Sequence, residues 1–179
     1  NNEYKLDSKI LGNIDPNEII NFHSIKKEIK SYLCILNSDG RFKKVLFDED
    51  MYKSNRSFAI TKLKKNIKTI DSFIFYEEKD LIILTSIGRI FKFNLSNKSL
   101  TPTTKQSQGL ILTKLLPTEK IVSCCQTHNK ENIYLVSKQG KIFCLNNNEI
   151  YYGNEYSLGY LNERTQLKND QFIKILPSK

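Results

Sequence analysis

Five basic side chains recur at fixed places beside glycines in this 179-residue sequence. Arg41, Arg89 and Lys141 each follow a glycine directly, and Lys44 and Lys92 each lie four residues past one. Guanidinium and ammonium groups that repeat along a surface are suited to binding phosphates. The pattern predicts one track of cations that contacts a polyanion. The alternative is a set of solvated charges that protects exposed strand edges.

Each of these cations falls in a predicted β-hairpin, and the hairpin occurs three times. Each copy is an apolar run, a short link ending in Gly40, Gly88 or Gly140, and a second run. These glycines are 48 and 52 residues apart. A second register opens four apolar strands 51 residues apart, at Ile19, Ile70, Ile121 and Phe172. The chain is therefore predicted to be a repeat protein.

The repeats predict an all-β fold in one repeat domain, residues 1–179. Residues 1–30 form the second half of a blade, and residues 31–80, 81–131 and 132–179 form one blade each. In the middle unit we expect strands at 81–86, 89–95, 109–115 and 121–128, and no segment keeps a helical period. Four antiparallel strands in ~51 residues indicate a propeller-like array of four-stranded blades.

The formal net charge of +9 has two interpretations. A basic excess attracts polyanions, nucleic acid first. A Lys- and Asn-rich chain is also basic through composition alone. The predicted linkers add four candidate phosphate contacts, Lys53, Arg56, Lys98 and Lys105. The densest basic cluster is Lys62, Lys64, Lys65 and Lys68, which either binds phosphate or forms a solvated turn.

Other chemistry has little support in the sequence. Cys125 and His128 make one loose pair, whereas structural zinc needs four close ligands. We therefore expect no metal site, and we expect the four cysteines to be buried thiols in a reducing, cytosolic setting. No nucleophile motif or phosphate loop is present, so no catalytic residue is predicted. No apolar run is long enough to span a membrane.

The repeat resembles the C-terminal domain of the A subunit of bacterial type IIA topoisomerases, the DNA gyrase and topoisomerase IV family. That family repeats Thr-x-x-Gly-x-x-x-Arg/Lys, then Gly and an apolar strand, then Leu-x-x-x-Asp/Glu-x-Ile/Val. The middle unit matches at Thr85 to Gly88 with Lys92, at Gly109 to Leu112, and at Leu115 to Val122. Phe58 stands where the first unit should have the linker glycine, and Cys144 replaces the basic residue of the last unit. The seven-residue gyrase box has at best a degraded counterpart, Thr104 to Gly109.

The resemblance implies a β-pinwheel, in which neighbouring blades exchange strands and duplex DNA wraps around a basic rim. The chain would then be a non-catalytic DNA-binding domain without a cofactor of its own. It would act with the cleavage core of the same polypeptide and with an ATPase subunit, in an enzyme that needs Mg²⁺ and ATP. Its location would be cytoplasmic, associated with the nucleoid. The alternative is a propeller-like scaffold that binds protein rather than DNA.

Overall fold

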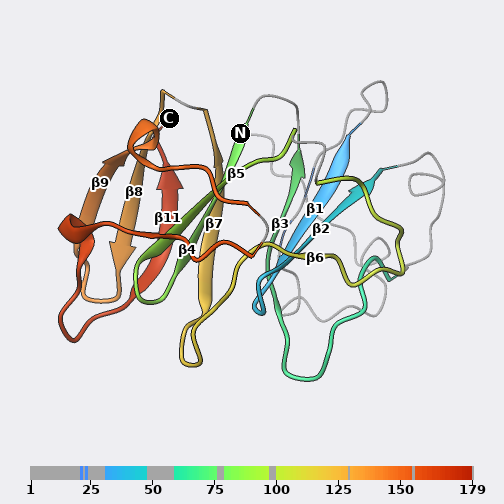
Figure 1. The fold of residues 1–179 in the computed structure, drawn as a ribbon, viewed down its shortest axis with the longest axis horizontal. Helices are drawn as coiled ribbons and strands as arrows, with labels where there is room; N and C mark the ends of the chain where they lie inside the picture. Colours follow the sequence, from blue (N-terminus) through green and yellow to red (C-terminus); the bar gives the residue numbers. More distant parts are fainter. Residues whose placement is uncertain are drawn as a thin grey trace, which may run out of the picture.

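The computed structural model describes residues 21, 23, 31–47, 59–75, 79–96, 100–128, 130–154 and 156–178. The predicted half-blade at 1–30 lies outside this part apart from Asn21 and His23. Three antiparallel sheets stand side by side, and the chain crosses them in order (Figure 1). The only helical segments described are two 3-10 turns, Asn147–Glu149 (η2) and Glu163–Thr165 (η3).

The first sheet has the order β3-β1-β2-β6. It consists of β1 (Tyr32–Asn37), β2 (Arg41–Leu46), β3 (Thr69–Phe75) and the two-residue β6 (Leu110–Ile111). The hairpin turn before β2 contains Gly40, whose φ of 82° suits a residue without a Cβ. Strand β6 comes from the following repeat, because residues 110 and 111 lie beyond the next hairpin of the chain.

The second sheet repeats this arrangement in the order β10-β5-β4-β7. Its own strands are β4 (Asp80–Thr85), β5 (Arg89–Asn94) and β7 (Ile121–Thr127). The fourth strand, β10 (Tyr160–Leu161), again comes from the following repeat. Neighbouring repeats therefore exchange strands, as the resemblance implied, and the fold is an all-β array of the β-pinwheel kind.

The third sheet has three strands in the order β11-β8-β9. These are β8 (Asn132–Ser137), β9 (Ile142–Asn146) and β11 (Phe172–Pro177). In the part of the chain that the structure describes, no strand pairs with the outer side of β9. This sheet is the one departure from the predicted four strands.

The cores lie between the sheets. Leu36 and Phe42 of the first sheet pack against Leu81 and Phe91 of the second. A separate core joins the other face of the second sheet to the third, through side chains such as Ile82, Ile90, Ile133, Leu135 and Phe172. The facing surfaces of adjacent sheets are thus buried against each other, as in other repeat architectures.

Two local expectations were wrong. The predicted strand at 109–115 is shorter in the structure: only β6 pairs as a strand with the first sheet, and Thr113 forms a single bridge with Ser157 of the following repeat instead. Strand β5 contains Arg89 and Lys92, which were predicted to belong to a track of cations that contacts a polyanion, yet it is buried over Arg89–Phe93. The charged groups of these two residues are accommodated by specific partners described below.

Candidate nucleic-acid interface

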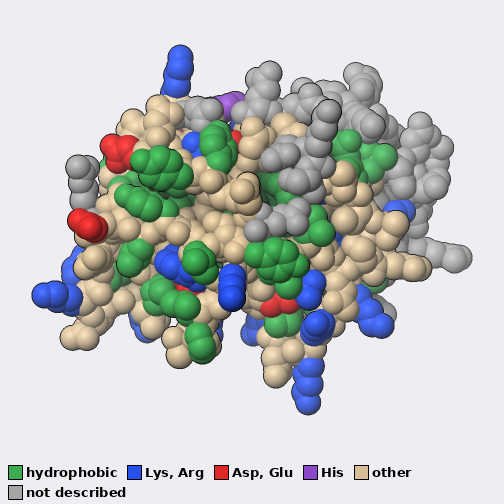
Figure 2. Space-filling view, in the orientation of Figure 1, with side chains coloured by type: hydrophobic (Ala, Val, Ile, Leu, Met, Phe, Trp, Pro, Cys, Tyr) green, Lys and Arg blue, Asp and Glu red, His purple; other side chains and the backbone are tan. Residues whose placement is uncertain are grey.

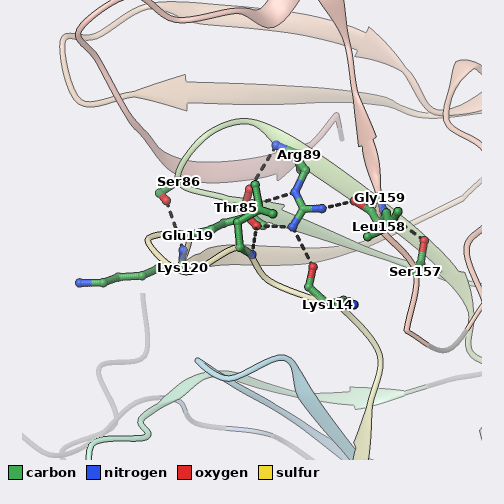
Figure 3. Close-up of polar contacts among 10 residues, drawn as sticks. Thr85, Ser86, Arg89, Lys114, Glu119, Lys120, Ser157, Leu158 and Gly159 are labelled. Carbon is green, nitrogen blue, oxygen red and sulfur yellow. Dashed lines mark hydrogen bonds and ion pairs between the residues drawn. The ribbon is translucent and has the colours of Figure 1, made fainter.

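Arg89 lies at the centre of a buried polar cluster that joins three segments of the chain (Figure 3). Its Nε donates to Glu119 Oε1 at 2.7 Å, and its Nη2 contacts Glu119 Oε2 and donates to the carbonyl of Lys114 at 2.8 Å. Its Nη1 donates to the carbonyl of Leu158, just before the exchanged strand β10. The Arg89 cluster therefore ties the hairpin, the loop before β7 and the next repeat together.

The electrostatics of this cluster depend on the ion pair. The Glu119 side chain is fully buried, and burial alone would raise its pKa. Hydrogen bonds from Arg89, the Leu116 backbone N–H and Thr85 outweigh that effect and hold the pKa of Glu119 below its ordinary value. Glu119 is therefore a charged partner of Arg89 and not a proton donor at neutral pH.

Arg41 makes a looser version of the same connection in the first sheet. Its Nη1 donates to the carbonyl of Gly109 at 3.4 Å, just before the exchanged strand β6. Its ion-pair partner is Asp39 in the adjacent turn, with 3.2 Å between Nε and Oδ2. The position that corresponds to Glu119 in this repeat is Ile67, 52 residues earlier, so the turn supplies the carboxylate instead.

Lys44 and Lys92 also reach into the following repeat. Lys44 Nζ donates to the carbonyl of Leu95 at 2.9 Å and lies over the ring of Tyr32. Lys92 Nζ donates to the carbonyl of Asn147 at 3.1 Å and lies 3.6 Å from Asp80 Oδ2. Burial lowers the pKa of Lys92, and the charge of Asp80 opposes that shift.

The prediction of one outward-facing track of five cations is therefore wrong for three of them. Lys44, Arg89 and Lys92 are buried, because their charged groups hydrogen-bond to carbonyl oxygens of the next repeat. Arg41 is half-buried and paired. Lys141 is exposed, as predicted. Basic side chains at equivalent positions thus hold neighbouring repeats together in the first two repeats and face solvent in the third.

The predicted linker contacts have mixed outcomes. Lys53, Arg56 and Lys98 lie outside the described residues. Lys105 is half-buried and lines a shallow surface hollow together with Lys62, Ala59, Thr61 and Gln106. Lys105 thus lies beside the densest basic cluster that the sequence contains.

The exposed cations gather where the hairpin turns meet the loops before β3, β7 and β11, an edge we call the turn edge. In each repeat a turn residue donates its backbone N–H to the loop at 2.8 Å: Ser38 to Lys68 O, Ser86 to Lys120 O and Lys138 to Gln171 O. The loops of successive repeats are therefore held in equivalent positions. The exposed lysines of this edge are Lys62, Lys64, Lys65, Lys68, Lys114, Lys120, Lys138, Lys141 and Lys168.

The turns and these loops lie on one side of the array, at the lower side of Figure 1. In the same orientation, Lys and Arg side chains are spread along the lower half of the surface (Figure 2). Carboxylates of this edge have partners of their own: Asp39 pairs with Arg41, Glu119 with Arg89, and Asp170 accepts from the backbone N–H of Gln139 and Gln171. Glu163, in the loop before β11, is an exposed carboxylate, so the loop lysines make this edge predominantly rather than wholly basic.

Part of this edge was not predicted from the sequence. The cluster from Lys62 to Lys68 was singled out, but Lys114, Lys120, Lys138 and Lys168 were not. A signal was present, because Lys62 and Lys114, and likewise Lys68 and Lys120, are 52 residues apart. These lysines could have been predicted if the repeat period had been applied to the loops as well as to the strands.

The described residues contain no group of three His, Cys, Asp or Glu side chains placed to hold a metal ion. Cys34 and Cys124 are buried thiols as predicted, Cys125 is half-buried, and Cys144 is exposed, contrary to the prediction. None of the described helical turns has the length or apolar character of a membrane-spanning helix.

No family model matches this sequence, and no curated protein matches it. Solved structures do. The C-terminal domain of DNA topoisomerase IV superposes with a TM-score of 0.72 at 16% identity, over 86% of this chain and 48% of that one. The chain shares the fold of that domain.

Two other solved structures are similar. The E. coli ParC C-terminal domain gives a TM-score of 0.57 at 13% identity, over 83% of this chain and 57% of that one. A DNA gyrase A C-terminal domain gives a TM-score of 0.49 at 14% identity, over 97% of this chain and 78% of that one. The chain spans about half the length of the topoisomerase IV and ParC domains that it matches.

Proposed function

We propose that this chain is a DNA-binding module of a type IIA topoisomerase A subunit and that it holds duplex DNA against the turn edge. The observation that carries the proposal is the row of exposed loop lysines, kept in equivalent positions by the repeated backbone hydrogen bonds between turn and loop. The fold shared with the topoisomerase IV domain supports the assignment.

The turn edge suits phosphate contact rather than base readout. Lysine ammonium groups on turns and loops offer point charges without the planar fork that reads base edges. A rigid array of such charges binds DNA through its backbone, independently of sequence, and can favour a bent duplex. Among the residues predicted from sequence, Lys141 and Lys105 take part in this contact. Arg41, Lys44, Arg89 and Lys92 act indirectly, by fixing neighbouring repeats.

The module itself performs no chemistry in this proposal. It presents DNA to a cleavage core on the same polypeptide, and an ATPase subunit completes the enzyme. Mg²⁺ and ATP act in those parts and not at residues of this chain. The enzyme works on cytoplasmic, nucleoid-associated DNA.

The test is duplex binding as a function of salt, with matched pairs of lysines. We expect binding to weaken steeply between ~50 and ~200 mM salt, because each phosphate contact releases a counterion. Lys114→Gln with Lys120→Gln should flatten the slope of log K against log salt by about 2. Lys130→Gln with Lys174→Gln is the control, since both side chains are exposed and neither lies in a loop of the turn edge.

Equal losses in the two double variants would contradict the placement of DNA on the turn edge. Binding that does not depend on salt, together with salt-insensitive capture of a protein, would support the scaffold alternative instead.

A further inference from the structure

Each sheet presents two surfaces toward the repeat that follows it, an outer strand edge and an outer face. In the first two sheets both are occupied. The edge pairs with the exchanged strand, at Arg41 and Phe42 in β2 and at Arg89 and Ile90 in β5. Farther along the same edges, the backbone N–H groups of Thr103 and Gly153 donate to the carbonyls of Lys44 and Lys92 at 2.7 and 2.8 Å.

The outer faces of the first two sheets are covered as well. Phe42 is 2% exposed and Ile90 is 1% exposed, because both pack beneath the following repeat. A Cβ on Gly40 would lie 2.5 Å from Thr113 Oγ1, and one on Gly88 would lie 2.7 Å from the ring of Phe172. Even the turns are thus in contact with the repeat that follows.

The third sheet has the same two surfaces, and both are open. Ile142, which corresponds to Phe42 and Ile90, is 68% exposed, and Tyr134 and Leu176 are 36% and 45% exposed. A Cβ on Gly140 would meet nothing within 4 Å. The third sheet therefore has the same surface on which the first two sheets bind the following repeat, and none of the described residues covers it.

The edge of β9 is also suited to pairing. Ser137 N donates to Lys141 O, so the N–H and C=O groups of alternate residues, Ile142 and Cys144 among them, point away from β8. The five residues of β9 include no charged side chain. Natural sheets usually protect an exposed edge with charge, proline or a bulge, so an apolar edge such as this one is a template for another strand.

We propose that the third sheet is an acceptor for a further repeat of the same type. That repeat would supply an apolar sheet face to cover Tyr134, Ile142 and Leu176, and an extended segment to pair with β9. The sequence of that segment can be stated, because each exchanged strand is two residues long and is preceded by a glycine at positive φ. These are Gly109 before Leu110–Ile111 and Gly159 before Tyr160–Leu161. Lys141 would hold it by donating to a carbonyl, as Arg89 holds Leu158.

A second copy of the chain fits this acceptor less well. Its own exchanged strands are engaged within the molecule. The face that its first sheet would offer is already buried, with Leu33, Ile35 and Ile74 at 8%, 6% and 6% exposure. A further repeat presents a free face and a free strand together. This inference does not depend on DNA binding.

The experiment appends a copy of residues 130–179 to Lys179. This join leaves four residues between Pro177 and the second Asn132, as many as separate Thr127 from Asn132 in the chain. The readout is alkylation of Cys144 in the original sheet, with Cys144→Ser in the appended copy. Cys34, Cys124 and Cys125 should react slowly, because burial raises the pKa of Cys34 and Cys125 to about 12 and also raises the pKa of Cys124 well above its ordinary value.

We expect Cys144 to react rapidly in the 179-residue chain and at least ~10-fold more slowly in the extended one, because a covering sheet must open before the reagent enters. The control places Ile142→Asp in the original sheet. In the 179-residue chain it should leave the urea midpoint unchanged, since the side chain is exposed. In the extended chain it should restore rapid alkylation.

Two results would overturn the proposal. Cys144 reactivity that is the same in both chains would mean that the appended repeat does not cover the sheet. The second result is a dimeric 179-residue chain in which Cys144 is already protected and becomes reactive in the Ile142→Asp variant. That result would identify a second copy of the chain as the occupant.

Discussion

The second and third sheets are built from the same repeat, yet their equivalent residues do different things. Arg89 is buried against Glu119 and the carbonyl of Leu158, whereas Lys141, 52 residues later, is exposed. Ile90 is 1% exposed and Ile142 is 68% exposed. The difference comes from the neighbour, since the second sheet receives a strand and a covering face and the third does not. In a repeat array, the role of a side chain is set by the presence of the next repeat.

The largest expected effect is a charge at the covered position. Ile90→Asp should cost about 4 kcal/mol of unfolding free energy or abolish folding, because it buries an unpaired carboxylate among apolar side chains. Ile142→Asp should change the free energy of unfolding by less than ~0.5 kcal/mol. Urea unfolding followed by fluorescence or circular dichroism measures both. Similar costs for the two variants would mean that the two positions have the same surroundings.

The second largest loss of stability is expected when the arginine at the centre of the Arg89 cluster is removed. Arg89→Met leaves Glu119 buried and unpaired, which costs ~3–5 kcal/mol for a buried ion pair that loses one partner. Arg41→Met should cost no more than ~1 kcal/mol, because the Arg41–Asp39 pair is partly solvated. A control, Arg89→Met with Glu119→Leu, should recover part of the loss. No recovery would show that Arg89 stabilises the fold through its carbonyl contacts alone.

The turn glycines should differ by a smaller amount. Gly88→Ala and Gly140→Ala both place a Cβ at positive φ, 91° and 84°, which costs ~1–2 kcal/mol. Only Gly88→Ala also forces a Cβ against the ring of Phe172. The difference between their thermal midpoints isolates that contact. Equal midpoints would mean that Phe172 moves aside without cost.

The pH dependence of stability should show the smallest effect. The folded pKa of Glu119 is depressed, so its ion pair contributes stability above the ordinary glutamate pKa of 4.5 and loses it as pH falls through the folded value. The chain should therefore become less stable to urea below about pH 4.5, and Glu119→Gln should reduce that dependence. An unchanged pH profile in the variant would assign the acid sensitivity to other carboxylates.

The sequence predicted the strands well because the period of 51 residues fixed which apolar runs are equivalent, from Ile70 to Phe172. It did not predict where the cations point. Lys92 is a charged residue on an otherwise apolar strand, and its ammonium group donates to the backbone carbonyl of Asn147. A pattern of residue types cannot predict a partner that is a backbone carbonyl 55 residues away. Strand exchange was likewise implied only by the resemblance, since a two-residue pairing such as Leu110–Ile111 leaves no periodic signal.

The most direct test of the division between buried and exposed cations is lysine footprinting by acetylation and mass spectrometry, with and without duplex DNA at low salt. Without DNA, Lys44 and Lys92 should be nearly unreactive, because both are buried and hydrogen-bonded, and the loop lysines should react freely. DNA should protect Lys62, Lys64, Lys65, Lys68, Lys114 and Lys120 and leave Lys130 and Lys174 unprotected. Protection of Lys130 and Lys174 with the loop lysines unchanged would contradict the account.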